Sequence, residues 1–189
     1  HPGFKITPGL AARAAMAAGL GDVLMRCIYR MRPYELEPGA VNALHHTWEA
    51  RCRAFVASAH PSLAAYRRMC RQIIEEFDRV PISEARKVRV GIVGEILVKF
   101  SPMANNHLVD TLEREGAEAV VPDLLDFMSY CLYNTNFKAE YLGAKPSSAR
   151  KANWGIGLIE WLRKTAVDAF SRSRHFTPPA RIEHLAEMA

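Results

Sequence analysis

The sequence predicts an α/β fold that is rich in helix, with a small parallel Rossmann-like sheet flanked by helices and preceded by a helical N-terminal segment. Residues 88–93 are rich in β-branched side chains, which favour a buried strand. A helical pattern begins at Asn105 and ends at Gly116, and residues 119–121 form a second apolar strand that ends before Pro122. Strand, helix and strand in this order build parallel sheets, so we expect two to four strands.

Three helices are expected ahead of the strands, over residues 8–29, 38–59 and 61–80. Their apolar side chains recur at helical spacing, so one face of each helix should be buried. Pro33 should end the first helix, because the residue before a proline avoids helical angles. Gly19 and Gly21, inside the first helix, either divide it or let another helix approach closely.

Residues 79–87 are polar and include Pro81, so we place a boundary there. It separates a helical segment over residues 1–80 from an α/β unit over residues 88–189. Beyond the second strand, Asp123 is placed to cap a helix that ends at about residue 133. A turn over 134–137, a long helix over 147–170 and a last helix from Arg181 complete the expected elements.

The composition is that of an ordinary globular domain, with 49% hydrophobic and 24% charged residues. No apolar run is long enough for a membrane span and no signal peptide is recognisable, so we expect a cytoplasmic protein that does not bind a membrane. The chain starts at His1 and not at a methionine, and we interpret it as a piece of a longer protein.

The formal net charge of +5 suits an anionic partner. Most arginines lie on predicted helices beside acidic residues, and this scattering argues against nucleic-acid binding. An anionic nucleotide or an acyl-CoA stays open as a ligand.

Motifs that would bind a cofactor or metal are absent from the sequence. Gly91-x-x-Gly94 is not the dinucleotide motif G-x-G-x-x-G, and no phosphate-binding G-x-x-x-x-G-K-S/T occurs. The four cysteines have no metal-binding spacing, so we expect reduced, buried thiols, no metal site and no cofactor in this chain. They are Cys27, Cys52, Cys70 and Cys131.

The end of the first strand is the best candidate for a functional site. Gly94 and Glu95 follow the strand, and Asn105 and Asn106 open the next helix. Ligands of parallel sheets bind outside the carboxyl ends of the strands, and helix N-termini attract phosphates and carboxylates. The alternatives are a glycine needed for packing, an exposed carboxylate, and asparagines that only cap the helix.

Two histidine-containing groups are weaker candidates. His45 and His46 lie near Glu49, but adjacent helical residues point about 100° apart, so the two histidines do not easily share a metal. We favour a solvated helix face for them. His107 and Asp110, about one turn apart, are interpreted as a surface pair.

Two basic segments also have a structural interpretation. Arg30, Arg32 and Glu35 would form local ion pairs, which contribute little at a surface. The basic residues ahead of Trp154 could belong to a surface that stacks nucleic-acid bases, but we favour a basic helix start with a buried tryptophan.

The most distinctive stretches are Val-Gly-Ile-Val-Gly-Glu-Ile-Leu-Val-Lys-Phe-Ser-Pro-Met-Ala-Asn-Asn over 90–106 and Gly-Ala-Glu-Ala-Val-Val-Pro-Asp-Leu-Leu-Asp-Phe over 116–127. Together with Gly21-Asp22 and Arg32-Pro-Tyr-Glu35, they resemble the large CoA-substrate-specific enzyme activase proteins. These proteins are long relatives of the activator of 2-hydroxyglutaryl-CoA dehydratase. The resemblance spans about residues 1–185.

This resemblance implies a domain of an ATP-dependent activator of a 2-hydroxyacyl-CoA dehydratase. Such proteins couple ATP hydrolysis to low-potential electron transfer through an iron–sulfur cluster, here expected to be a 4Fe-4S cluster. The chain would correspond to the added region that is similar to the dehydratase D-component. ATP and the cluster would be bound by other parts of the full-length protein, because their phosphate loops and cysteine motifs are not in this sequence. The expected partner is the dehydratase or another domain of the same protein.

The resemblance also implies a set of ligand-binding residues, which are Gly94, Glu95, Lys99, Asn105 and Asn106. They would line a cleft that positions a CoA-type ligand or a partner surface, with no complete active site in this chain. Two other functions stay open. One is a free-standing module that binds an anionic nucleotide or acyl-CoA at the helix that starts at Asn105. The other is a helical interaction scaffold that uses residues 8–77.

Overall fold

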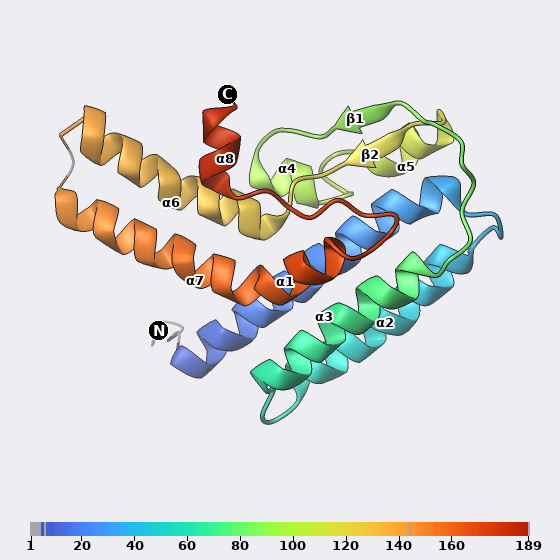
Figure 1. Cartoon of the computed structure of the whole chain (residues 1–189), viewed down its shortest axis with the longest axis horizontal. Coiled ribbons are helices and arrows are strands. Elements are labelled where there is room, and N and C mark those ends of the chain that lie inside the picture. Colours follow the sequence, from blue (N-terminus) through green and yellow to red (C-terminus); the bar gives the residue numbers. More distant parts are fainter. Residues whose placement is uncertain (1–4, 6, 144, 189) are drawn as a thin grey trace.

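Long helices make up most of the computed structural model, which describes residues 5, 7–143 and 145–188, and a two-stranded sheet lies beside them (Figure 1). The elements in chain order are α1 (Pro8–Met31), η1 (Arg32–Tyr34), α2 (Ala40–Ala57), α3 (Leu63–Asp78), β1 (Arg89–Gly91), α4 (Ile96–Phe100), α5 (Leu108–Arg114), β2 (Glu118–Val120), α6 (Leu124–Tyr141), α7 (Pro146–Phe170) and α8 (Ile182–Glu187). The fold is therefore helix-rich with a small parallel sheet, as predicted.

Helix α1 is central, because α2, α3, α6, α7 and β2 all contact it. Its first turn is stabilised by Thr7, whose side chain accepts a hydrogen bond from the Leu10 N–H at 3.2 Å. The helix is continuous through Gly19 and Gly21. A Cβ atom built on Gly19 would lie 2.3 Å from the Tyr66 hydroxyl, so this glycine allows α3 to approach. Pro33 lies in η1, a 3-10 turn that directly follows α1.

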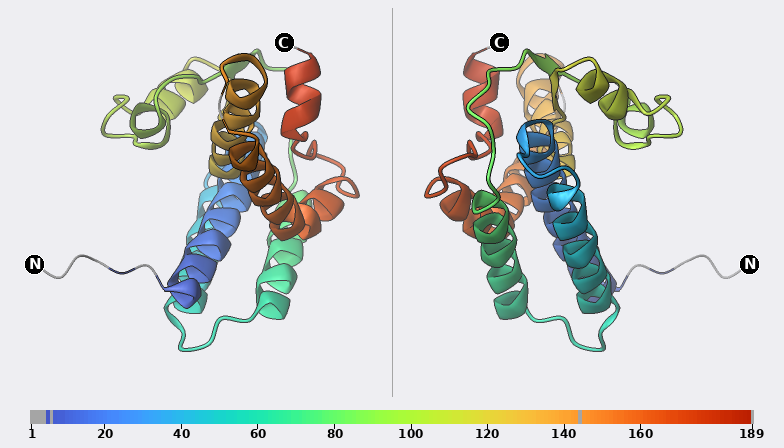
Figure 2. Two further views of the ribbon diagram at one scale, coloured as in Figure 1. Left: turned by 90° about the vertical axis from the view of Figure 1, so that its left-hand side faces the viewer. Right: turned by 90° about the vertical axis from the view of Figure 1, so that its right-hand side faces the viewer.

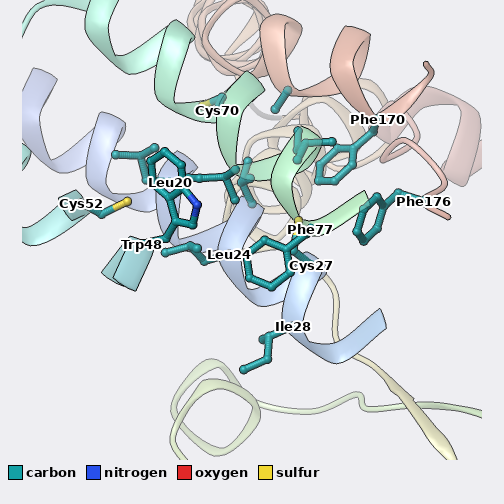
Figure 3. Close-up of a cluster of buried hydrophobic side chains, with 14 of the residues drawn as sticks. Leu20, Leu24, Cys27, Ile28, Trp48, Cys52, Cys70, Phe77, Phe170 and Phe176 are labelled. Atoms are coloured by element: carbon teal, nitrogen blue, oxygen red, sulfur yellow. The ribbon is translucent and has the colours of Figure 1, made fainter. Parts of the chain in front are cut away.

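One hydrophobic core contains residues from both sides of the boundary that we expected at 79–87. Leu20 and Cys27 of α1 and Phe77 of α3 lie in the same cluster as Phe170 of α7 and Phe176 beyond it (Figure 3). Phe170 and Phe176 also meet edge to face, with their ring centroids 5.5 Å apart. Burial of this apolar surface stabilises the two segments jointly.

The predicted strand-helix-strand unit is present, in a shorter form. β1 and β2 pair in parallel, with Arg89 opposite Glu118 and Gly91 opposite Val120. β1 ends at Gly91, and a short helix, α4, begins after Glu95. Figure 2 shows α4 and α5 on one side of the α6–α7 hairpin and α8 on the other.

The turn predicted over residues 134–137 is wrong, because α6 continues to Tyr141. Two polar side chains in this stretch donate hydrogen bonds within the helical hairpin. Thr135 donates a hydrogen bond to the Cys131 carbonyl at 3.4 Å, and Asn136 donates to Asn153 of α7 at 2.5 Å. Gly155 lets Leu132 pack closely against α7.

Gly19→Ala should destabilise the protein by about 1–3 kcal/mol, because the new methyl group overpacks the contact with Tyr66. Gly21→Ala is the matched control, since no heavy atom lies within 4 Å of its Cβ position. We expect it to stabilise α1 by up to about 1 kcal/mol. Urea unfolding of both variants measures the difference. Equal effects of the two substitutions would contradict close packing at Gly19.

Candidate functional site

A cleft of about 710 Å³ lies between the C-terminal half of α1, residues 82–89, the strand β2 and residues 174–177. Cationic side chains dominate its lining: Arg26, Arg30, Arg86, Lys87, Arg89 and Arg174. The acidic residues of the lining are Glu84 and Glu118. The lining therefore has four more cationic than acidic side chains, and two of the cations, Arg26 and Arg174, also pair with Asp123 and Asp78 outside the lining. We call it the cationic cleft.

Glu118 anchors the cationic cleft from the first position of β2. Its side chain is only 5% exposed and accepts three hydrogen bonds. The donors are the Tyr34 hydroxyl at 2.8 Å, Arg30 Nη1 at 3.2 Å and Arg89 Nε at 3.1 Å. Burial and the bond to Glu118 raise the pKa of Tyr34. A buried carboxylate needs this compensation, and it holds the two arginines in place at the cleft.

The opposite wall is a loop held by Asp78 at the end of α3. The Asp78 carboxylate accepts hydrogen bonds from the backbone N–H groups of Arg174 at 2.9 Å and His175 at 3.0 Å. Arg30 Nε donates to the His175 carbonyl at 2.9 Å. The loop is thus attached to both α3 and α1, so the cleft has fixed walls.

The cationic lining suits an anionic ligand, above all one with phosphate groups. Guanidinium groups bind phosphate through two parallel hydrogen bonds, and lysine binds it as a point charge. The Arg86 and Arg89 residues are exposed, so their charges face solvent at the mouth of the cleft. The arrangement favours binding over bond-making. Sequence reasoning missed this cleft, because its cations come from segments far apart in the chain.

The residues predicted at the strand end occupy a different region. Glu95 Oε2 accepts hydrogen bonds from the N–H groups of Leu97 at 2.9 Å and Val98 at 3.3 Å, so it caps α4. Gly94 has a φ of +140°, a conformation that favours glycine. The local backbone therefore gives both residues a structural role.

The two asparagines shape the loop ahead of α5. Asn105 Nδ2 donates to the Val98 carbonyl at 2.9 Å, and its Oδ1 accepts from the Leu108 N–H at 3.2 Å. This second bond is the capping role weighed in the sequence analysis. Asn106 and His107 each have a φ of 54°, in the left-handed region. His107 Nδ1 lies 3.3 Å from Asp110 Oδ2 in the expected exposed pair.

Lys99 and Asn105 line a second cleft of about 400 Å³, between α1, α2 and residues 99–110. Gly94, Glu95 and Asn106 are not part of its lining. Lys99 is 8% exposed, and its Nζ lies 5.1 Å from the ring centroid of Phe100 and 5.0 Å from that of Phe127. Aromatic faces attract the ammonium group, so they hold Lys99 at the base of this cleft.

Gly21-Asp22 and Arg32-Pro-Tyr-Glu35, which carry part of the resemblance, make long-range contacts. Asp22 accepts hydrogen bonds from the N–H groups of Leu124 at 2.7 Å and Leu125 at 2.9 Å, and so caps α6 from α1. Burial, together with repulsion from Asp123, raises the pKa of Asp22 to about 7. Arg26 Nη2 lies 2.8 Å from Asp123 Oδ2 in the same cluster.

The local ion pairs expected among Arg30, Arg32 and Glu35 do not form. Arg30 and Arg32 instead pair with acids of the strand-helix-strand unit, and Arg32 Nε lies 2.6 Å from Glu113 Oε2. The carboxylate of Glu35 accepts hydrogen bonds from the backbone N–H groups that open α2. The resemblance motif therefore connects distant segments.

Two expectations about buried side chains need correction. Cys27, Cys52 and Cys70 are buried as expected, and burial raises the pKa of Cys52 to about 11 and that of Cys70 to about 12. Cys131, however, is exposed. Trp154 is 73% exposed and not buried as we expected. Neither residue differs from a buried one in its local sequence pattern.

No helix within the described residues has the length and apolar character needed to cross a membrane. Comparison with known proteins identified no relative: no family model, no curated protein and no solved structure matches this chain.

Asp22→Asn should reduce the gain in stability that the protein shows on acidification. In the folded state Asp22 binds a proton below about pH 7, whereas the unfolded chain binds it only below its ordinary pKa of 3.8. Stability should therefore rise as the pH falls from about 7.5 to about 5, and be lost again as the pH rises through 7. Urea midpoints at the two pH values measure the effect.

Asp168→Asn serves as the control, because Asp168 is an exposed acid that pairs with Lys164 on the same helix. We expect it to leave the pH dependence as it is in the wild type. If Asp22→Asn also leaves that dependence unchanged, Asp22 is ionised in the folded protein at neutral pH.

Proposed function

We propose that this chain binds the phosphate-bearing part of a CoA-type ligand in the cationic cleft, as a domain of an ATP-dependent activator of a 2-hydroxyacyl-CoA dehydratase. The single observation that supports this choice of ligand is that six cationic side chains line one cleft. A CoA ester presents a diphosphate and a further phosphate, and its anionic charge complements this lining.

A separate observation supports the proposal that the chain is a domain of an activator. The segments 90–106 and 116–127, which carry the resemblance, form one unit around β1 and β2. In the proposed arrangement, ATP and the iron–sulfur cluster bind to other parts of the full-length protein. The chain then has a binding role and no complete active site.

We also propose that the strand-helix-strand unit belongs to a larger Rossmann-like sheet. Two paired strands alone are marginally stable in water. Val88, just before β1, and Val93, two residues after it, are 74% and 84% exposed, which is unusual for β-branched residues beside a sheet. Further strands next to β1, contributed by the full-length protein, would cover this surface.

Charge reversal at the mouth of the cleft tests the ligand. The double variant Arg86→Glu/Lys87→Glu should weaken the binding of CoA and acetyl-CoA by roughly 10–100-fold, because it replaces attraction by repulsion. Isothermal titration calorimetry at low ionic strength measures the affinity. Binding by the wild-type chain should also weaken as salt is added.

Arg68→Glu is the matched control, since Arg68 is an exposed cation of α3 outside the lining of the cleft. We expect it to leave CoA binding unchanged. ATP, titrated in parallel, tells a nucleotide module from a CoA module. Absence of binding of CoA, acetyl-CoA and ATP at about 1 mM would overturn the proposed ligand, because a specific site should be occupied at this concentration.

The α6–α7 hairpin favours a second function, the docking of a protein partner. Large apolar side chains stay exposed along it: Met128, Tyr130, Phe137, Tyr141, Leu142, Trp154, Leu158 and Trp161. Such a concentration marks interaction surfaces, and aromatic residues are enriched in them. Residues 8–77, the predicted scaffold surface, instead place most of their large apolar side chains in the core. An interaction role would therefore use the hairpin.

Trp154→Glu should abolish docking while changing the free energy of unfolding by less than about 0.5 kcal/mol, because the side chain is exposed. Met103→Glu is the control, as Met103 is 89% exposed but lies outside the hairpin. Binding of a purified 2-hydroxyacyl-CoA dehydratase to the immobilised chain measures docking. Equal binding by both variants and the wild type would rule out the hairpin as the contact surface.

A further inference from the structure

Three potential metal-binding side chains converge on α2. The ligand atoms of His45, His46 and Glu49 all lie within 4.8 Å of one another. From the sequence alone we favoured a solvated helix face for these three residues, because adjacent helical residues point about 100° apart. Glu49 lies four residues after His45 and three after His46, and both spacings place side chains on neighbouring positions of a helix. Glu49 therefore lies between the two histidines, and the three donors share one face.

The position of Glu49 is fixed by a second contact. Arg53, one turn further along α2, donates from Nη2 to Glu49 Oε1 at 2.6 Å. The other oxygen, Oε2, lies 3.7 Å from His46 Nδ1 and is directed at the histidines. Bound carboxylates commonly have such supporting hydrogen bonds, which orient the ligand. The arrangement leaves one carboxylate oxygen for a metal.

The exposure of His46 lets the three donor atoms reach the spacing that a metal requires. His46 has 76% of its side chain exposed and can rotate. Donors around a tetrahedral zinc, with bonds of about 2.0–2.1 Å, lie roughly 3.3 Å apart. A rotation of the His46 side chain that moves its donor nitrogen by about 1–2 Å would bring the donor atoms to this spacing.

Two of the three residues also border a cleft. His45 and Glu49 line the second cleft together with Lys99 and Asn105, which come from the opposite side. A metal held by three protein ligands keeps one position open, and here that position would face the cleft. A carboxylate or carbonyl oxygen of a bound molecule could occupy it, next to the ammonium group of Lys99.

We propose that His45, His46 and Glu49 form a three-ligand site for a divalent transition metal, with its open position facing the second cleft. Two nitrogen donors and one oxygen donor suit Zn²⁺ and Co²⁺, whereas Mg²⁺ and Ca²⁺ prefer oxygen donors alone. The site is independent of the cationic cleft, so either can fail without the other. No metal-binding sequence motif marks it, because the spacing H-H-x-x-E belongs to none of the known short motifs that we considered.

Titration of the purified chain with Zn²⁺ in a calorimeter, and with Co²⁺ followed by its visible absorption, tests the site. We expect one equivalent of each metal and a Co²⁺ spectrum that shows nitrogen ligation. His45→Ala, His46→Ala and Glu49→Gln should each weaken Zn²⁺ binding by roughly tenfold or more, which corresponds to about 1.4 kcal/mol. Because the three side chains are exposed or half-exposed, these substitutions should leave the fold intact, which circular dichroism checks.

The chain offers a matched control in His184, an exposed histidine of α8. Its Nδ1 lies 3.9 Å from Glu187 Oε2 at the same three-residue spacing, but no second histidine is beside it. His184→Ala should leave Zn²⁺ binding unchanged. The proposal is overturned if the wild type shows no saturable binding, or if His184→Ala weakens Zn²⁺ binding as much as His45→Ala does.

Discussion

Ion pairs from one end of α1 join the first part of the chain to the second. Arg26 pairs with Asp123 ahead of α6, Arg30 with Glu118 of β2, and Arg32 of η1 with Glu113 of α5. Their acidic partners are nearly buried, with side-chain exposures of 8%, 5% and 13%. Loss of one partner from a buried pair leaves an uncompensated charge and costs about 3–5 kcal/mol. These three contacts therefore set where the sheet lies against the helices.

The same contacts explain the distribution of charge around the cationic cleft. Glu118 accepts hydrogen bonds from both Arg30 and Arg89, so one buried carboxylate neutralises part of the charge of two guanidinium groups and holds them in place. The charge that is left for a ligand comes from the rim, where Arg86, Lys87 and Arg174 lie. A ligand would thus contact two arginines that Glu118 orients and three cations at the rim that can adjust to it. Preorganisation of the two arginines reduces the entropy lost on binding.

The sequence was sufficient for features that depend on neighbouring residues and insufficient for those that depend on distant ones. Periodicity predicted the long helices, and β-branched residues predicted the parallel strands. The turn expected at 134–137 was wrong, because Asn136 donates a hydrogen bond to Asn153 of α7, a helix that the sequence did not place beside it. The capping role of Asn105 could be foreseen, since its partners are local. The cationic cleft could not, because Arg26 and Arg174 meet only through the tertiary fold.

The exposure of Cys131 has a practical consequence for the chemistry of the whole chain. Thiol reagents attack the thiolate, and burial raises the pKa of Cys27, Cys52 and Cys70. Cys131 is accordingly the one thiol of the chain that such a reagent reaches in the folded state. It lies midway along α6, one residue from Tyr130 on the apolar hairpin. A fluorophore attached there would respond to anything that covers the hairpin, while air oxidation would cross-link two chains through the same position.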